Sequence, residues 1–198
     1  MSYENLLVLL GLAFTAAFTP GPNNALVASS GANFGYRRTI PHILGIAAGF
    51  SFMVFVVGFI LGTAFEQSRI LREVLRWGGA AVLFWIAWKI AVSGGLGRSP
   101  DSARPFRFYE AAAFQWINPK AWVMAIAIPA QFITGEAPLG AALAVAAVFL
   151  AVGFCSSSSW ALVGRALTRW INTKSRMRWF NMAMGAMIAT LVVLLLLE

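Results

Sequence analysis

The sequence predicts an all-α polytopic membrane protein with six transmembrane helices, arranged as two inverted three-helix repeats in which helices 1 and 4 are broken. Three observations support this fold class. Of the 198 residues, 60% are hydrophobic and 11% are charged, whereas an ordinary soluble domain has roughly 45–50% apolar and 25% charged residues. Several long stretches contain no Lys, Arg, Asp or Glu. Proline motifs interrupt the first and the fourth predicted helix.

The composition also excludes other classes of protein. So few charges could not cover the surface of a soluble domain of this length. A β-barrel is disfavoured because the apolar runs are continuous rather than alternating. The single Cys155 excludes an internal disulfide framework, and with only one histidine besides it no metal cluster and no cofactor are expected. The net charge of +8 lies in short segments between apolar runs, as the positive-inside rule predicts for cytoplasmic loops, and so indicates no nucleic-acid partner.

Each predicted span is an apolar stretch long enough to cross a bilayer, for which about 20 residues are needed. The spans are Leu6–Ala32, Ile43–Phe65, Val74–Ser93, Phe108–Ile133, Leu139–Val163 and Trp179–Leu197. The first follows no basic segment and is too long for the core of a signal peptide, so we expect it to be retained. We expect one transmembrane domain over residues 1–198, with repeats over about 1–95 and about 105–198.

The distribution of basic residues predicts the orientation. The loops after the first, third and fifth spans carry most of the Lys and Arg, so we expect them in the cytoplasm and both termini in the periplasm. Arg69 and Arg72 in the second loop oppose this orientation. The basic residues of the three cytoplasmic loops are Arg37, Arg38, Arg98, Arg104, Arg107, Arg165, Arg169, Lys174, Arg176 and Arg178.

The first span contains the motif Thr-Pro-Gly-Pro-Asn-Asn at residues 19–24. Pro20 and Pro22 each remove a backbone N–H and disfavour helix in the preceding residue, so together they should break the span rather than bend it. Gly21 between them gives the turn conformational freedom. Pro22, followed by Asn23 and Asn24, then begins a second half-helix.

The fourth span is interrupted at Asn118-Pro119-Lys120. Asn118 is a good N-cap and Pro119 suits the first helical position, so this motif also begins a half-helix. The N-terminus of a half-helix offers free N–H groups and a partial positive charge, which suit a carboxylate. The helix dipole disfavours the cation of Lys120 in this first turn, and a bound anion would relieve the conflict.

The two breaks occupy corresponding places in the two halves, and three spans per half put the halves in opposite orientations. Paired interruptions of this kind point to the binding site of a secondary transporter. The alternative is structural, because proline kinks are common in membrane helices and a buried Asn can simply bond to a neighbouring helix.

Further polar or small residues complete the candidate site. Gly45 and Gly49 form a G-x-x-x-G motif that packs helices closely or lets the second span approach a broken helix. Gln115 is a deeper polar group on the fourth span. His42 at the edge of the second span and Glu110 near the start of the fourth are either structural groups or candidates for proton coupling. Four serines at residues 156–159 of the fifth span are expected to hydrogen-bond between helices.

The two motifs at this separation resemble the hallmark motifs of the lysine exporter / homoserine–threonine resistance (LysE/RhtB) family. The similarity includes the chain length, the glycine-rich second span, Lys89 and the motif at residues 129–132. It implies a bacterial inner-membrane exporter of amino acids or their derivatives, driven by the proton motive force. Many members carry an acidic residue at the position of Asn23, which leaves His42 or Glu110 as ionisable candidates here. The central-site positions that the resemblance implies are Pro20, Gly21, Pro22, Asn23, Asn118, Pro119 and Lys120.

We therefore expect a secondary exporter of small neutral amino acids by proton antiport, not an enzyme, with membrane lipids as its other partners. A basic substrate would need an intramembrane Asp or Glu to compensate its second cation, and an inorganic cation would need a cluster of such groups. A basic amino-acid or inorganic-cation exporter remains an alternative, and so does a non-transporting scaffold subunit, although a scaffold would not need two helix breaks. The sequence is compatible with a homo-oligomer and does not define one.

Overall fold

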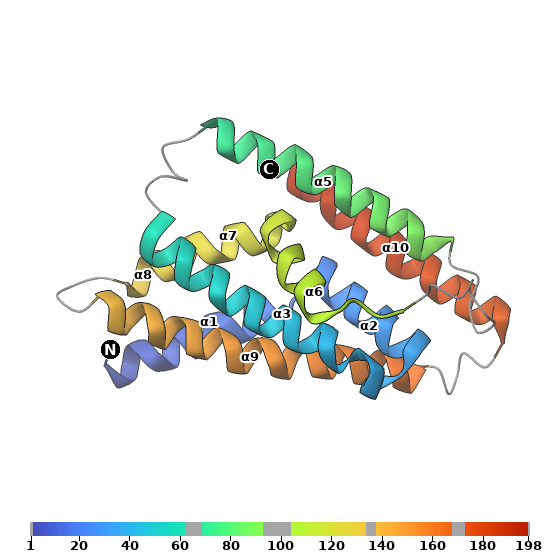
Figure 1. Cartoon of the computed structure of the whole chain (residues 1–198), viewed down its shortest axis with the longest axis horizontal. Coiled ribbons are helices and arrows are strands. Elements are labelled where there is room, and N and C mark those ends of the chain that lie inside the picture. Colours follow the sequence, from blue (N-terminus) through green and yellow to red (C-terminus); the bar gives the residue numbers. More distant parts are fainter. Residues whose placement is uncertain (1, 62–68, 93–103, 134–137, 168–172, 198) are drawn as a thin grey trace.

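The computed structural model describes residues 2–61, 69–92, 104–133, 138–167 and 173–197, and no strand occurs in these ranges (Figure 1). The prediction of an all-helical chain is therefore confirmed for the described residues. The predicted span ends at Phe65 and Ser93 lie outside them.

The first predicted break is confirmed. Helix α1 (Tyr3–Phe18) and helix α2 (Pro22–Phe34) meet at an angle of 59°. Pro22 is the first residue of α2, where its missing N–H removes no helical hydrogen bond.

The second predicted break is also confirmed. Helix α6 (Phe108–Phe114) passes through a 3₁₀ turn, η2 (Gln115–Ile117), before helix α7 (Pro119–Ala127) begins. Asn118 leaves the helical conformation with φ −87° and ψ 110°, and its side-chain oxygen accepts a hydrogen bond of 3.2 Å from the backbone N–H of Lys120. A further interruption that the sequence analysis did not predict precedes the short helix α8 (Pro129–Phe132).

The remaining helices are continuous. They are α3 (Tyr36–Val56), which runs into a π-helical turn η1 (Val57–Leu61), α5 (Arg69–Ala91), α9 (Pro138–Leu167) and α10 (Lys174–Leu197).

The predicted starts of several helices are wrong because the helices extend beyond the apolar runs. Helix α3 begins at Tyr36 rather than Ile43, and α10 begins at Lys174 rather than Trp179. Long basic side chains at a helix end reach toward polar surroundings while the backbone stays helical, so charge does not mark the end of the helix. A single residue, Gly35, separates α2 from α3, and its φ of +79° is a conformation that favours glycine.

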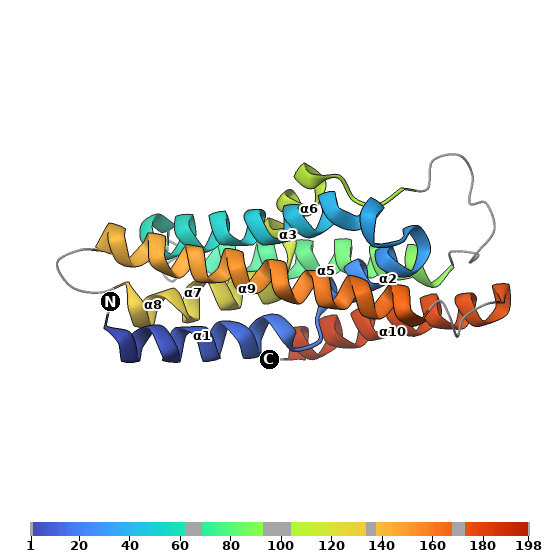
Figure 2. The same cartoon turned by 90° about the horizontal axis from the view of Figure 1, so that it is seen from below.

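The helices form one main body with a helix pair beside it. Antiparallel α3 and α9 run through the main body, with α1 and α2 packed against α9 and with α6 against α3. Helices α5 and α10 pack on each other along one side and contact the rest mainly through α2 and α7 (Figures 1 and 2). A core cluster between α1, α3, α7 and α9 includes Leu9, Phe50, Trp122 and Phe149.

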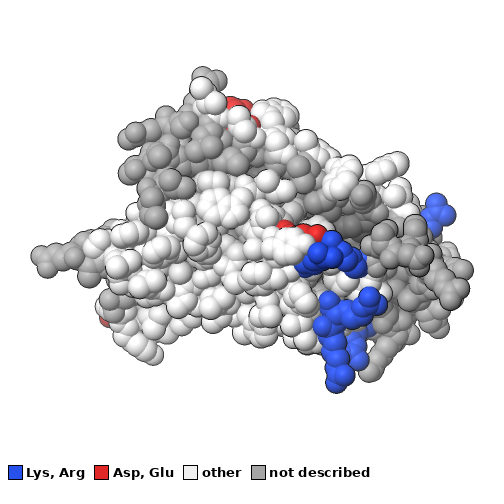
Figure 3. Space-filling model, viewed as in Figure 1, with Lys and Arg blue, Asp and Glu red and all other residues white. Residues whose placement is uncertain are grey.

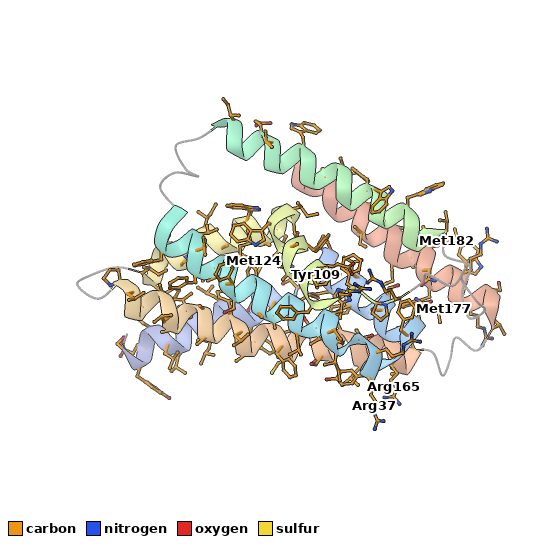
Figure 4. The ribbon with its side chains drawn as sticks, in the orientation of Figure 1. Arg37, Tyr109, Met124, Arg165, Met177 and Met182 are labelled. Atoms are coloured by element: carbon orange, nitrogen blue, oxygen red, sulfur yellow. The ribbon has the colours of Figure 1, made fainter. Side chains whose placement is uncertain are left out.

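Charge separates the two ends of the molecule. The start of α3, the end of α9 and the start of α10 lie at one end, and the N-terminus lies at the other (Figure 1). The blue side chains in Figure 3 gather toward the first end, and Arg37 and Arg165 lie there in Figure 4. Described basic residues of the first and the fifth predicted loop thus lie at the same end.

The outer surface suits a membrane. Large apolar side chains are exposed on several helices, among them Phe14, Phe52, Val123, Leu143 and Trp179. Within the described ranges, two helical segments are long and apolar enough by themselves to cross a bilayer, Tyr36–Phe59 and Pro138–Leu167. The bent pair of α1 and α2 makes a third if it is counted as one span. Length and composition therefore support two or three of the six predicted spans.

Helices α2 and α9 approach each other backbone to backbone. A Cβ atom on Gly31 would lie 2.2 Å from the carbonyl oxygen of Ala161, and one on Gly164 would lie 2.0 Å from that of Ala28. The two glycines form a reciprocal pair, each facing the other helix at a small residue. Small residues of this kind permit close packing between helices in membranes.

Gly164→Ala is expected to destabilise the protein by about 1–3 kcal/mol, because the added methyl group overpacks this contact. Thermal unfolding in detergent would measure the effect. Gly140→Ala on the same helix is the matched control, since a Cβ there meets nothing within 4 Å. Equal melting temperatures for the two variants would refute the close approach of α2 and α9.

Candidate functional site

A cavity lies where the two breaks meet, enclosed by α1, α2, α3, α7 and α9. Its empty volume, which includes the open space at its mouth, is about 510 Å³. One part of the wall is apolar and includes Ile46, Phe50, Met124 and Phe149. The polar side chains of the wall are Asn23, Asn24, Asn118, Lys120, Ser156 and Ser157.

The structure thus brings both predicted motifs to one cavity. Pro22, Asn23 and Asn24 reach it from the start of α2, and Asn118 and Lys120 from the start of α7. Figure 4 labels Met124, which contributes to the apolar wall from α7. Ser156 and Ser157 join the wall from α9, so the serine run serves the cavity as well as contacts between helices.

The end of α1 determines how these elements meet. The last carbonyl groups of a helix have no partner within the helix. Asn24 Nδ2 donates hydrogen bonds to the carbonyl oxygens of Ala17, at 3.0 Å, and of Thr19, at 2.9 Å. Ser156 Oγ donates a further bond of 2.7 Å to the Ala17 oxygen. Helices α2 and α9 therefore both hold the end of α1.

Lys120 connects the two breaks directly. Its Nζ donates hydrogen bonds to the carbonyl oxygens of Thr19, at 2.8 Å, and of Pro20, at 3.3 Å. The C-terminal end of a helix carries a partial negative charge, so the end of α1 compensates the cation that the start of α7 disfavours. From the sequence alone, a bound anion was the expected source of this compensation. An ammonium group has three N–H donors, so these two contacts leave one for a ligand.

Gly21 has a different role from the predicted one. Its φ of −166° is extended backbone that any residue adopts, so the turn does not require glycine for its conformation. A Cβ atom here would lie 2.9 Å from Nζ and 3.0 Å from Cδ of Lys120. Glycine therefore provides the space through which the lysine side chain reaches the break.

Gln115 lies behind the cavity and not in its wall. It is fully buried and pairs with Asn23 through two hydrogen bonds, from Asn23 Nδ2 to Gln115 Oε1 at 2.8 Å and from Gln115 Nε2 to Asn23 Oδ1 at 3.3 Å. Its Nε2 also donates to the carbonyl oxygen of Ala111 at 2.8 Å. Gln115 thus orients Asn23 and forms a second polar link between the two broken segments.

Gly45 and Gly49 also lie outside the cavity wall. A Cβ on Gly45 would lie 2.3 Å from the carbonyl oxygen of Phe108, and one on Gly49 would lie 2.4 Å from Cα of Ala112. Both glycines therefore pack α3 against α6, the first part of the broken fourth segment. This agrees with the expectation that the second span approaches a broken helix.

The expected position of His42 at the edge of a span is wrong. Because α3 begins at Tyr36, His42 lies inside the helix and is only 2% exposed. Its Nδ1 is buried and has no hydrogen-bond partner, and its ring lies 5.1 Å from that of Phe106. On α3, His42 is one turn before Ile46, so it lies on the helix face that continues into the cavity wall.

Glu110 is engaged elsewhere. Arg104 donates to both of its carboxylate oxygens, at 2.6 Å and 2.5 Å, and the backbone N–H of Arg107 donates to it at 2.8 Å. The hydrogen bonds to Glu110 raise the pKa of the Arg104 guanidinium above its usual value. Glu110 is half-buried and lies in the first turn of α6. Its negative charge there interacts favourably with the helix dipole.

The remaining predicted positions are the two outer prolines. Pro20 contributes its carbonyl oxygen to the contact with Lys120, and Pro119 is the first residue of α7. Among the described residues that line the cavity, Lys120 is the charged side chain and none is acidic. No group of three or more His, Cys, Asp or Glu that could hold a metal occurs within the described ranges.

Sequence reasoning missed the apolar wall. Phe50 and Phe149 contact edge to face with ring centroids 5.3 Å apart, but an aromatic residue in an apolar span carries no local sign of facing a cavity. The four consecutive serines were a usable signal for Ser157, because a polar run within an apolar helix needs partners.

Two broken helices that meet at a cavity inside an apolar helical body are features of secondary transporters. The family model described as "LysE type translocator" matches residues 14–198. The chain therefore belongs to the LysE family of amino-acid efflux translocators, whose members are membrane transporters and not enzymes.

Similar proteins match most of the chain. A "Homoserine/homoserine lactone efflux protein" of Salmonella typhimurium is 27% identical over 192 residues, which cover 94% of this chain and 93% of the relative. A "Cysteine/O-acetylserine efflux protein" of Klebsiella pneumoniae is 30% identical over 155 residues, which cover 77% and 78%. The protein of that name from Escherichia coli K12 is 29% identical over 158 residues, with the same coverage. No solved structure matches the chain with significance.

Proposed function

We propose that this protein is a secondary exporter of the bacterial inner membrane that moves small neutral amino acids or their derivatives out of the cytoplasm in exchange for protons. The observation that carries the proposal is the cavity between the two breaks, whose described wall has Lys120 as its charged group and no acidic side chain.

In the proposed architecture, six spans form one domain of two inverted repeats with both termini in the periplasm. The first repeat contains α1, α2, α3 and α5, and the second contains α6, α7, α9 and α10. The packing of the helices supports this division, because α3 pairs with α9, α5 pairs with α10, and the contact of α1 with α9 corresponds to that of α6 with α3. The concentration of described basic side chains at one end supports the orientation.

The substrate carboxylate is proposed to bind between the starts of α2 and α7. These helix N-termini provide partial positive charge beside Asn23 and Asn118. The remaining N–H of Lys120 adds a charge-assisted hydrogen bond. The substrate ammonium group would meet oxygen acceptors of the wall, among them the hydroxyl groups of Ser156 and Ser157.

The apolar wall favours a short, uncharged substrate side chain. A basic side chain would carry a second cation into a low-dielectric cavity with no carboxylate in its described wall, and such a cation is costly. Homoserine, cysteine and O-acetylserine, which the names of the relatives mention, are small amino acids with uncharged side chains. A neutral substrate is therefore favoured over the basic amino-acid and inorganic-cation alternatives.

Uptake of radiolabelled amino acids by inside-out vesicles with an acidic lumen tests this proposal. Homoserine, threonine and cysteine are expected to compete at least about tenfold better than lysine or arginine, a difference of about 1.4 kcal/mol in binding. Dissipation of the pH gradient should abolish accumulation, and vesicles without the protein are the control. If lysine or arginine were the best substrate, the preference for a neutral side chain would be refuted. If accumulation persisted after the pH gradient was dissipated, proton antiport would be refuted.

His42 is the proposed proton-coupling group. A histidine changes its charge near physiological pH, and His42 is buried, lacks a partner at Nδ1 and lies one turn from the cavity wall. Glu110 on α6 is the carboxylate that interacts with it electrostatically, and Arg104 pairs with that carboxylate. Because Glu110 is already paired, it is the weaker candidate.

His42→Gln is expected to lose gradient-driven accumulation and to retain exchange of labelled for unlabelled substrate without a gradient, because the variant binds substrate but carries no proton. Glu110→Gln is the comparison, and it should keep accumulation since a partly exposed ion pair contributes only about 0–1 kcal/mol. If Glu110→Gln loses accumulation and His42→Gln keeps it, the coupling role belongs to Glu110.

A further inference from the structure

The contact between Lys120 and the break in the first span has the form of an occupied cation site. We propose that the Lys120 ammonium is a tethered cation that fills a monovalent-cation site formed by the carbonyl groups of Thr19 and Pro20. Transport then needs no free Na⁺ or K⁺, and removal of the lysine side chain opens the site to a free monovalent cation. The inference rests on the proposed function for its transport readout.

The carbonyl geometry supports this assignment. Thr19 has left the helix with φ −59° and ψ 130°, and the next residue begins the link to α2. The oxygens of Thr19 and Pro20 accept from one ammonium group at 2.8 Å and 3.3 Å. Unwound carbonyl groups and the C-terminal ends of half-helices are the groups with which transporters with broken helices bind Na⁺. Here a side chain of the other broken segment supplies the cation.

The electrostatics of the cavity also favour a cation at the end of α1. The partial negative charge at the end of α1 attracts a cation, and the described wall contains no carboxylate that would pair with Lys120 instead. Without the ammonium group, the Thr19 oxygen keeps its bond from Asn24, whereas the Pro20 oxygen loses the bond from Lys120. Thr19 and Pro20 are exposed residues, so the carbonyl pair stays open to a free cation when the ammonium group is absent.

The chain also leaves space for the tether. The lysine side chain passes Gly21 so closely that a Cβ there would lie 2.9 Å from Nζ. Gly21→Ala therefore displaces the ammonium group while it leaves every polar group and charge of the site in place. Gly21→Ala therefore tests whether the ammonium group must occupy this position, whereas Lys120→Ala tests whether it must be present at all.

The test compares purified protein in NaCl, in n-propylammonium chloride and in choline chloride at equal ionic strength. Propylammonium replaces the atoms that Lys120→Ala removes, and choline has no N–H donor. Na⁺ or propylammonium should raise the melting temperature of Lys120→Ala relative to choline, and should leave wild type and Lys120→Met unchanged. Lys120→Met is the matched control because its side chain fills the same path without a charge.

Transport in vesicles supplies the second readout. In choline, Lys120→Ala should lose about ten- to a hundredfold of the wild-type uptake, as expected for loss of a charge-assisted hydrogen bond. Propylammonium should restore a measurable part of this loss, and it should not restore Lys120→Met. Gly21→Ala should show reduced uptake with the lysine still present.

Two results would overturn the inference. One is wild-type uptake by Lys120→Ala in choline. The other is folded Lys120→Ala whose melting temperature and uptake respond to neither Na⁺ nor propylammonium. Lys120→Ser leaves the same space and serves in the same measurements if Lys120→Ala does not fold. Wild-type vesicles that move no amino acid would refute the proposed function, while the melting measurements would still decide the cation site.

Discussion

The structure depends on the carbonyl groups at the end of α1, which have no partner within the helix and lie beside the cavity. A carbonyl group that is shielded from water and stays unpaired costs several kcal/mol. Their donors come from three directions, because Asn24 belongs to α2, Ser156 to α9 and Lys120 to α7. The hydrogen bonds to the end of α1 therefore bring both broken segments and α9 to the same place.

The same constraint produces a binding cavity. A break that exposes carbonyl groups on one side exposes helix N-termini on the other, so the start of α2 and the start of α7 face the space that the donors enclose. Close packing holds this arrangement together, through Gly31 and Gly164 between α2 and α9 and through Gly45 and Gly49 between α3 and α6. The close contacts at these glycines thus hold together the helices whose polar side chains line the cavity.

Local chemistry was readable from the sequence, and long-range packing was not. The breaks at Pro22 and Pro119 could be predicted because a proline acts on its own backbone and on the residue before it. The purpose of Gly21 could not, since it depends on a lysine in the other half of the chain. Burial of His42 was missed because α3 begins before the apolar run, and the pairing of Gln115 with Asn23 leaves no local pattern.

Protection of the cavity by substrate would test the central claim most directly. Ser157→Cys in a Cys155→Ser background places one nearly isosteric thiol in the wall, and wild type, with Cys155 exposed and outside the wall, is the control. We expect homoserine to slow the reaction of the thiol at position 157 with a small methanethiosulfonate reagent, which forms a mixed disulfide and releases methanesulfinate, and to leave labelling of wild type unchanged. An unchanged rate at position 157, under conditions in which the protein transports homoserine, would contradict the claim that the cavity between the two breaks is the substrate site.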